Sequence, residues 1–285
     1  MTIGLDAAYV RRVVAAALAE DVGPGDVTTL ATIPEGARCT AELNSRVDGV
    51  VAGLPVAIET FRQLDPGVHI EEHKRDGDRI SAEDRLLTLR GKARAVLTAE
   101  RVALNFTQRM SGTATATARF VQAVKGTRAK IIDTRKTTPG LRQLEKYAVR
   151  AGGGQNHRFG LFDGILIKDN HIAACPDGVG GAVVAARRGA PHSLRVEVET
   201  ETLDQVREAL EAGADAILLD NMSPAMLREA VRLIDGRAVS EASGGVTLEN
   251  VRAVAESGVD LISIGALTHS APALDLGLDF TLETT

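Results

Sequence analysis

Short apolar runs rich in β-branched residues recur along the second half of the chain, and each run ends in polar residues. The runs do not alternate strictly, which is typical of strands that are buried on both faces of a parallel sheet. The last four runs are spaced 22 residues apart, enough for one strand and one helix. The predicted strands are 130–133, 164–168, 195–198, 216–220, 238–243 and 261–265.

Helix start and stop signals separate these runs. Thr202 and Gln205 form a capping box, and Ser223 precedes a proline at the first helical position. The alternation of strand and helix predicts a parallel α/β fold. The predicted helices begin at Thr202, Ser223 and Thr247 and end at Gly213, Gly236 and Gly258.

A weak internal repeat agrees with this arrangement, because Gly213–Leu218 and Gly258–Ser263 are similar and lie 45 residues apart. Six strands within about 140 residues are too few for a complete eight-stranded barrel, which typically needs about 250 residues. Periodicity alone therefore leaves open a short or incomplete barrel and a doubly wound sheet. In either fold, ligands bind at the carboxyl ends of the strands.

The first part of the chain has a different pattern. A helix is predicted over 5–19, before a turn at 22–26 that contains Gly, Pro and Asp. Residues 93–125 read as helices that break near Ser111 and Gly112. We therefore expect a separate α+β domain that ends near residue 112, with strands at 40–46, 68–73 and 86–90.

Composition narrows the class of protein. The 285 residues suffice for one large domain or two smaller ones, and 44% are hydrophobic, as in an ordinary folded protein. Cys39 and Cys175 allow at most one bridge, which favours a reducing compartment. The apolar run 13–19 is short and ends at Glu20, which predicts an amphipathic helix rather than a signal peptide. No run approaches the roughly 20 apolar residues of a membrane span, so we expect a cytoplasmic protein.

The net charge of −5 is unevenly distributed. Residues 125–171 contain ten Lys and Arg against four Asp and Glu, so the rest of the chain is strongly acidic. Surfaces that bind nucleic acid usually add stacking aromatic residues, and only 3% of this chain is aromatic. The pattern instead predicts a small ligand with several negative charges.

Four cations lie at predicted strand ends or in the loops beside them. Arg135 and Lys136 follow the strand at 130–133, Lys168 ends the next one, and Arg158 lies in the loop between them. Any one of them alone would be read as a surface ion pair. Together they predict binding of carboxylates and phosphates, because Arg offers a bidentate fork and Lys a point charge.

Acids and glycines occupy the ends of the later strands. Glu197 and Asp220 either pair with a neighbouring cation, hold Mg²⁺ on an anionic substrate, or offset positive charge at a reacting carbon. The glycines in Ser243–Gly245 and at Gly265 let backbone N–H groups approach a phosphate. The sequence contains neither a Walker A motif nor a Gly-x-Gly-x-x-Gly nucleotide fingerprint.

Several longer motifs occur in order along nearly the whole chain. They are Glu20–Asp21, Gly25–Thr29, Leu97–Asn105, Thr134–Gly140, Lys146–Gly154, Asn156–Arg158, Ile167–His171, Glu197–Glu199, Leu219–Asn221, Ser243–Gly245 and Gly265–His269. Together they resemble the motifs of the quinolinate phosphoribosyltransferases, the decarboxylating type II enzymes of NAD synthesis. The resemblance implies transfer of phosphoribosyl from phosphoribosyl diphosphate to quinolinate, which gives nicotinate mononucleotide, CO₂ and diphosphate.

The resemblance also implies an architecture. An N-terminal α+β sandwich domain would span 1–112 and be joined by the C-terminal tail 270–285. An incomplete α/β barrel of about seven parallel strands would span 113–269. The family further implies a homodimer in which Arg101 is donated across the interface, with Mg²⁺ as cofactor and no nucleic acid or membrane as a partner.

The matching motif positions imply the following site residues. Quinolinate would contact Arg101, Thr134, Arg135, Lys136, His157, Arg158 and Lys168. Phosphoribosyl diphosphate would contact Lys136, Glu197, Asp220, Ser243, Gly244, Gly245, Ile264, Gly265, Ala266 and His269. Glu197 and Asp220 would hold the metal directly or through water, and these two with Lys136 and Lys168 would be the catalytic residues.

Three alternatives remain beside this interpretation. The first is a relative of the same fold that acts on another acid, although the intact Lys168–His171 motif favours quinolinate. Lys168 ends a predicted strand, as the lysine of a Schiff-base aldolase would. A non-catalytic phosphosugar-binding protein would leave Glu197 and Asp220 without a purpose.

One departure from the family pattern is the pair Phe159 and Phe162, where small or aliphatic residues are usual.

Overall fold

The computed structural model describes residues 4–283, and the chain divides into two compact units. The first unit comprises the chain up to Ala118, the segment Thr138–Gly153 and the chain from Ser270 onward. The second comprises Arg119–Thr137 and Gly154–His269. The division lies a few residues beyond the boundary predicted near residue 112 and assigns Thr138–Gly153 to the first unit.

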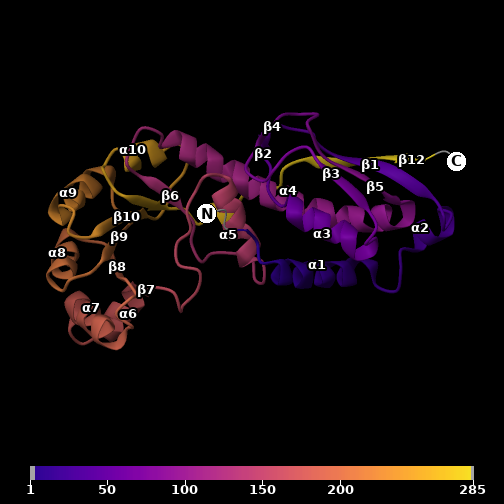
Figure 1. Cartoon of the computed structure of the whole chain (residues 1–285). Coiled ribbons are helices and arrows are strands. Elements are labelled where there is room, and N and C mark those ends of the chain that lie inside the picture. The colour runs from indigo at the N-terminus through magenta and orange to yellow at the C-terminus, as the bar shows by residue number, and fades with distance from the viewer. Residues whose placement is uncertain (1–3, 284–285) are drawn as a thin grey trace. The chain divides into compact units, whose positions relative to one another are not determined.

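The first unit contains a four-stranded antiparallel sheet in the order β12-β1-β5-β3 (Figure 1). The three strands predicted in this part of the sequence are confirmed. Strand β12 pairs along the whole of β1, so the end of the chain completes this sheet. The bounds are β1 Arg38–Ser45, β2 Gly49–Val50, β3 His69–Glu72, β4 Arg79–Ile80, β5 Arg85–Lys92 and β12 Leu276–Leu282.

The helices of this unit bury one face each. In α1, the buried residues Val10, Val14 and Leu18 are four apart and therefore lie on one side of the helix. They pack in one apolar cluster with residues of α3 and α5. The predicted N-terminal helix is confirmed. The bounds are α1 Ala7–Val22, α2 Val27–Thr32, α3 Leu54–Leu64 and α5 Arg142–Ala151.

Helix α4 (Ala93–Ala123) is continuous, so the predicted break near Ser111 and Gly112 is wrong. A β-carbon on Gly112 would lie 2.0 Å from the backbone oxygen of Pro272. Glycine is therefore needed here because another segment of the first unit packs directly on the helix backbone, and not because the helix ends.

The second unit contains a six-stranded parallel sheet in the order β6-β11-β10-β9-β8-β7. All six predicted strands are confirmed, and with them a parallel α/β sheet separate from the antiparallel one. Gln155 extends the sheet beyond β6 through a parallel bridge to Ile132. The bounds are β6 Lys130–Ile132, β7 Ile165–Ile167, β8 Val196–Thr200, β9 Ala216–Asp220, β10 Val239–Ser243 and β11 Leu261–Ser263.

Helices alternate with these strands along the chain (Figure 1). The predicted caps at Thr202 and Ser223 are confirmed, because their side chains accept from the backbone of the first turn. The cap predicted at Thr247 is wrong: Asn250 is the N-cap, and its side chain instead accepts from the backbone N–H of Thr247. The bounds are α6 Asp169–Ala174, α7 Gly178–Gly189, α8 Leu203–Glu211, α9 Pro224–Ile234, α10 Val251–Ala255 and α11 Ala266–His269.

The internal repeat has a structural cause in Asp215 and Asp260. Asp215 directly precedes β9. Its carboxylate accepts from the backbone N–H of Val196 in β8, and its backbone oxygen accepts from the backbone N–H of Val239 in β10. Asp260 repeats this arrangement one strand pair further on, where its carboxylate accepts from the backbone N–H and the hydroxyl of Ser240. Each aspartate thus joins the amino ends of three neighbouring strands, at the edge opposite their carboxyl ends.

No helix among residues 4–283 is long and apolar enough to cross a membrane. Cys39 and Cys175 are both free thiols. Burial raises the pKa of the Cys39 thiol to about 11, as expected for an inert core cysteine. The cytoplasmic location expected from the sequence stays a prediction.

We expect Asp260→Ala to lower the free energy of unfolding by about 1–3 kcal/mol, because the substitution leaves the Ser240 backbone N–H without its acceptor. Urea unfolding measures this difference. The matched control is Asp204→Ala, whose carboxylate is 93% exposed, and it should change stability by less than about 0.5 kcal/mol. Equal stability of both variants and the wild type would contradict the role assigned to the repeat.

Candidate active site

The carboxyl ends of the parallel strands line a cavity of about 790 Å³ in the second unit. Every residue predicted for the site lines it except Arg101, on an exposed turn of α4 in the first unit, and the buried Glu197. The lining residues are Thr134, Arg135, Lys136, His157, Arg158, Leu166, Lys168, Glu199, Leu218, Asp220, Asn221, Glu241, Ser243, Gly244, Gly245, Val246, Ser263, Ile264, Gly265, Ala266 and His269.

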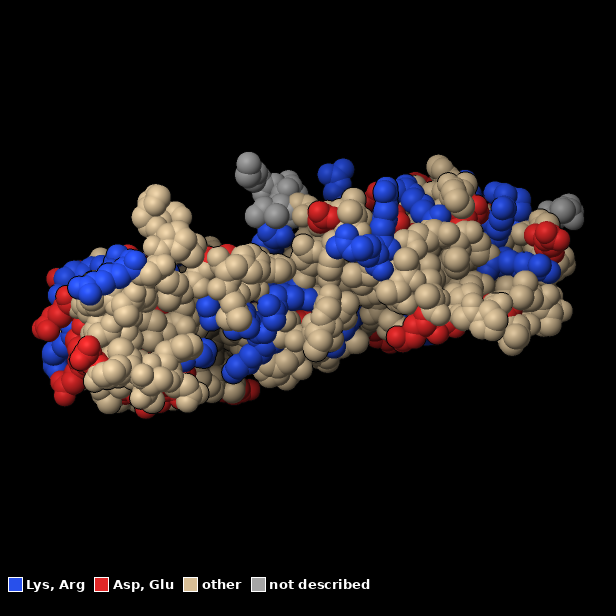
Figure 2. All heavy atoms as spheres, turned by 90° about the horizontal axis from the view of Figure 1, so that it is seen from below, with Lys and Arg blue, Asp and Glu red and all other residues tan. Residues whose placement is uncertain are grey.

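Two arginines face the cavity from neighbouring loops. Burial lowers the pKa of Arg158, and the nearby charge of Arg135 lowers it further. The guanidinium of Arg158 also donates to the backbone oxygen of Gly164 at 2.9 Å, which fixes its direction. Two like charges held this close form a place for an anion. Elsewhere both signs are interspersed, as the face in Figure 2 shows, so the net charge of −5 does not describe the cavity.

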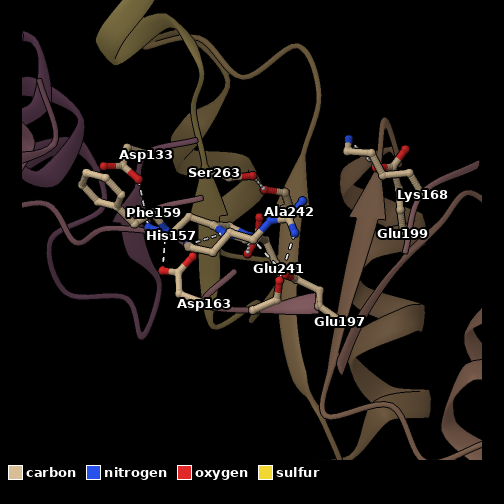
Figure 3. A network of polar contacts seen from close by, with 12 residues as sticks. Asp133, His157, Phe159, Asp163, Lys168, Glu197, Glu199, Glu241, Ala242 and Ser263 are labelled. Carbon is tan, nitrogen blue, oxygen red and sulfur yellow. Dashed lines mark hydrogen bonds and ion pairs between the residues drawn. The ribbon is translucent and has the colours of Figure 1, made fainter. Parts of the chain in front are cut away.

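Lys168 forms an ion pair with Glu199 across the strand ends (Figure 3), with 3.1 Å between Nζ and Oε2. The backbone N–H of Lys168 donates to Nδ1 of His171 at 2.9 Å, which fixes the first turn of α6. The lysine side chain is 47% exposed. A Schiff-base lysine works by being desolvated or placed beside another cation. An exposed lysine paired with a carboxylate does not favour the aldolase alternative.

Asp220 lies at the end of β9, next to a tightly packed glycine turn. Its Oδ2 accepts from the side chain of Asn221 at 2.6 Å. Asn221 has a positive φ of 53°, and a β-carbon on Gly244 would lie 2.1 Å from its side-chain oxygen. Only glycine therefore allows the turn after β10 to approach Asn221 this closely. Burial raises the pKa of Asp220, while the charges of Lys168 and Lys136 lower it.

His157, Glu197 and Glu241 form a network of polar contacts in the interior of the unit (Figure 3). His157 Nε2 lies 3.0 Å from Glu197 Oε2 and 3.7 Å from Glu241 Oε2. The backbone N–H of Arg158 donates to Nδ1 of His157 at 2.6 Å. Nδ1 is therefore an acceptor, and Nε2 carries the proton and donates it to Glu197.

The same three side chains lie close enough together to hold a cation. A metal at this point would need the lone pair of Nε2, however, and that nitrogen carries the proton while Nδ1 accepts from the backbone. The network as built is thus a set of hydrogen bonds, whereas Asp220 presents a partly exposed carboxylate to the cavity.

Glu241 is the most deeply buried carboxyl group of the network, with 1% of its side chain exposed. Burial raises its pKa well above 4.5, and the neighbouring charge of Glu197 raises it further. A hydrogen bond from Ser263 acts in the opposite direction. Two carboxyl groups in contact in a buried site share one proton. The raised pKa of Glu241 favours the protonated form of that carboxyl group.

The chain matches two sequence models along most of its length. Residues 26–111 match the quinolinate phosphoribosyl transferase N-terminal domain, and residues 113–279 match the C-terminal domain of the same family. The chain belongs to the quinolinate phosphoribosyltransferase family. The two matched regions meet beside residue 112, where the sequence predicts the end of the first domain.

Individual members of the quinolinate phosphoribosyltransferase family agree with this assignment. The chain is 49% identical to the probable nicotinate-nucleotide pyrophosphorylase [carboxylating] of Bacillus subtilis, over 92% of this chain and 90% of the relative. It is 47% identical to the Mycobacterium leprae nicotinate-nucleotide pyrophosphorylase [carboxylating], over 92% and 94%. The crystal structure of NadC from Streptococcus pyogenes superposes with a TM-score of 0.95 at 43% identity and covers 99% of both chains.

The motifs that match the quinolinate phosphoribosyltransferase family do not lead to every residue of the cavity. Most of the lining residues absent from the predicted set lie two positions from predicted ones, on the same strand face, whereas Asn221 and Val246 lie in the turns after β9 and β10. Glu241 precedes Ser243, and Leu218 precedes Asp220, whereas Glu199 follows Glu197 at the same spacing. The two-residue period of a strand is the signal that identifies them. Such missed lining residues are Leu166, Glu199, Leu218, Glu241 and Ser263.

We expect Glu241→Gln to alter how stability depends on pH. The folded state keeps a proton on Glu241 that the unfolded chain releases above about pH 4.5. The unfolded state thus binds fewer protons, and the free energy of unfolding of the wild type falls as pH rises above that value. Glutamine cannot lose this proton, so the variant should lose less stability as pH rises above about 5.

Urea unfolding at several pH values measures this slope, which approaches about 1.4 kcal/mol per pH unit for one proton. Glu229→Gln, at an exposed position on α9, is the matched control and should keep the wild-type slope. The assignment of the buried proton is wrong if Glu241→Gln and the wild type show the same slope.

Proposed function

We propose that this chain transfers phosphoribosyl from phosphoribosyl diphosphate to the nitrogen of quinolinate and releases CO₂ and diphosphate, leaving nicotinate mononucleotide. The observation that carries the proposal is the close pair Arg135 and Arg158, set in one cavity with Asp220 and a glycine turn. Such a cavity provides cations for an acidic acceptor, a carboxylate near a developing positive charge, and backbone donors for a phosphate.

Quinolinate has carboxylates on two adjacent ring carbons, and both need cationic partners. Arg135 and Arg158 can each give two parallel hydrogen bonds to a carboxylate. Lys168 supplies a point charge once a substrate carboxylate competes with Glu199 for it. Thr134, Lys136 and His157, which also line the cavity, complete the acceptor site that we infer.

The phosphoribosyl diphosphate site that we infer lies at the ends of β10 and β11. Gly244 and Gly245 follow β10, and Gly265 lies just before α11, so backbone N–H groups can approach the 5′-phosphate without side chains between them. Around these glycines, Ser243, Ile264, Ala266 and His269 line the cavity. Lys136 is exposed beside Gly265 and supplies positive charge toward the diphosphate.

Magnesium is the cofactor that we infer for the diphosphate. Asp220 suits it, because its carboxylate is half-exposed in the cavity and Mg²⁺ prefers oxygen ligands together with water. Glu197 suits direct coordination less well, since its side chain is 11% exposed and one oxygen already accepts from His157. We infer that Glu197 acts through water or on the ribose. When bound, the metal neutralises charge on the leaving diphosphate.

The chemistry follows from these placements. Loss of diphosphate leaves positive charge on the sugar C1, and the carboxylate of Asp220 in the cavity stabilises that charge, with Glu197 acting through water or on the ribose. The quinolinate nitrogen donates its lone pair to C1 as the bond to diphosphate breaks. The nitrogen is then positively charged, so the electron pair of the adjacent C–carboxylate bond stays on the ring carbon as CO₂ leaves, stabilised by the neighbouring positive charge. A proton at that ring carbon completes the product.

We also infer a homodimer in which a partner copy donates Arg101. The support is that Arg101 is exposed and does not line the cavity, although it matches a family motif. For the parallel sheet, we infer that its strands curve into an incomplete barrel of about seven strands. The bridge between Ile132 and Gln155 supports this, because it adds a short seventh segment beyond β6.

We expect Arg135→Ala to raise the KM for quinolinate by about tenfold to a hundredfold, because a charged hydrogen bond contributes about 1.5–3 kcal/mol. Arg135→Lys should recover only part of the loss, since lysine lacks the bidentate fork. Steady-state assays of mononucleotide formation measure both, with Arg232→Ala at an exposed position of α9 as the control.

The wild type should use quinolinate and not nicotinate as acceptor. An unchanged KM in Arg135→Ala, or equal use of nicotinate, would count against the proposal.

A further inference from the structure

A fully buried carboxylate lies directly beside the cavity without lining it. Asp133 follows β6, has no exposed surface, and immediately precedes Thr134, Arg135 and Lys136. A carboxylate buried this deeply is costly unless several donors hold it. Its donors come from the loop that bears the other arginine of the site.

Hydrogen bonds hold that loop against Asp133. The side-chain Nδ2 of Asn156 donates to Oδ2 of Asp133 at 2.6 Å. The backbone N–H of His157 donates to Oδ1 at 2.9 Å, and Figure 3 shows these two residues side by side. In the reverse direction, the backbone N–H of Asp133 donates to the backbone oxygen of Gln155 at 3.2 Å. Residues 155–157 are therefore joined to the end of β6 through one side chain.

This arrangement determines the spacing of the two arginines. Asp133 lies two residues before Arg135 in the sequence. Its hydrogen-bond partner His157 lies one residue before Arg158. The two guanidinium groups repel each other until an anion lies between them. Something other than the ligand must therefore hold the loops together in the free enzyme, and the buried carboxylate has the contacts to do so.

We propose that Asp133 is a positioning residue, which holds the Arg135 and Arg158 loops at the separation that two adjacent substrate carboxylates require. The proposal rests on the proposed function for the identity of the substrate. The role does not involve contact with the substrate, since Asp133 does not line the cavity. It lowers the cost of binding by holding the site in order before the substrate arrives.

The decisive variant is Asp133→Asn, which keeps the shape of the side chain. Both oxygens of Asp133 accept hydrogen bonds, one from Asn156 and one from His157. In the variant one oxygen becomes an NH₂ group, which cannot accept, so one of these two hydrogen bonds is lost. We expect the KM for quinolinate to rise about tenfold or more, while the KM for phosphoribosyl diphosphate changes by less than about twofold. Asn156→Asp should have a similar effect, because two carboxylates then face each other.

The exchange of both residues is the strongest test. In Asp133→Asn with Asn156→Asp, the amide of residue 133 donates to the carboxylate of residue 156, and its oxygen still accepts from the His157 N–H. We expect the double variant to recover the quinolinate KM to within about threefold of the wild type. A double variant no better than either single one would overturn the proposal.

A merely structural role is separated by a matched control. Asp260→Asn alters another carboxylate that accepts from a backbone N–H of the same sheet, at the opposite strand ends. Its loss of thermal stability should leave both KM values within about twofold of the wild type. If Asp133→Asn raises both KM values together, or leaves that for quinolinate unchanged, the proposal is wrong. Should Asp133→Asn not fold, Asn156→Ala removes the same side-chain bond and should raise only the quinolinate KM.

Direct binding keeps this test independent of turnover. Phthalate has two adjacent ring carboxylates but no ring nitrogen, so it can bind without reacting. Titration calorimetry should show about tenfold weaker phthalate binding in Asp133→Asn and recovery in the double variant. A wild type that binds phthalate but does not convert quinolinate would contradict the proposed function alone. Equal phthalate affinity in the wild type and Asp133→Asn would contradict the positioning role.

Discussion

Parallel pairing of β6–β11 is the constraint on which the rest of the structure depends. Because all six strands run in the same direction, their carboxyl ends lie at one edge of the sheet. Residues far apart in sequence, such as Arg135, Asp220 and Gly265, therefore line one cavity. At the opposite edge, hydrogen bonds of Asp215 and Asp260 join the amino ends of neighbouring strands. Chemistry and stability thus lie at different ends of the same sheet.

Charge is balanced in layers within that sheet. Arg135, Arg158 and Lys168 lie around the cavity, whereas the buried Glu241 lies at its inner wall and Glu197 lies behind His157. The contact from His157 to Glu197 and the raised pKa of Glu241 both lower the cost of burying these acids. Because Arg135, Lys136, Arg158 and Lys168 all line the cavity, an acidic chain still presents a cationic site.

Much of this could be predicted from the sequence, because burial on both sheet faces and motif order are local signals. All six parallel strands and about two thirds of the cavity-lining residues follow from them. What could not be predicted depends on contacts between distant segments. Gly112 looks like a helix break, but Pro272 packs on it. Thr247 looks like a cap, but Asn250 takes that place. Asp133 has no motif of its own, and its importance comes from Asn156 and His157 folding against it.

The central claim is that one cavity couples phosphoribosyl transfer to loss of a carboxylate. The most direct measurement follows CO₂ released from carboxyl-labelled quinolinate together with diphosphate, in the same reaction with the purified wild-type protein. The account predicts that one CO₂ appears for each diphosphate, and that neither appears when phosphoribosyl diphosphate is omitted. Diphosphate release without CO₂, or CO₂ release without phosphoribosyl diphosphate, would contradict it.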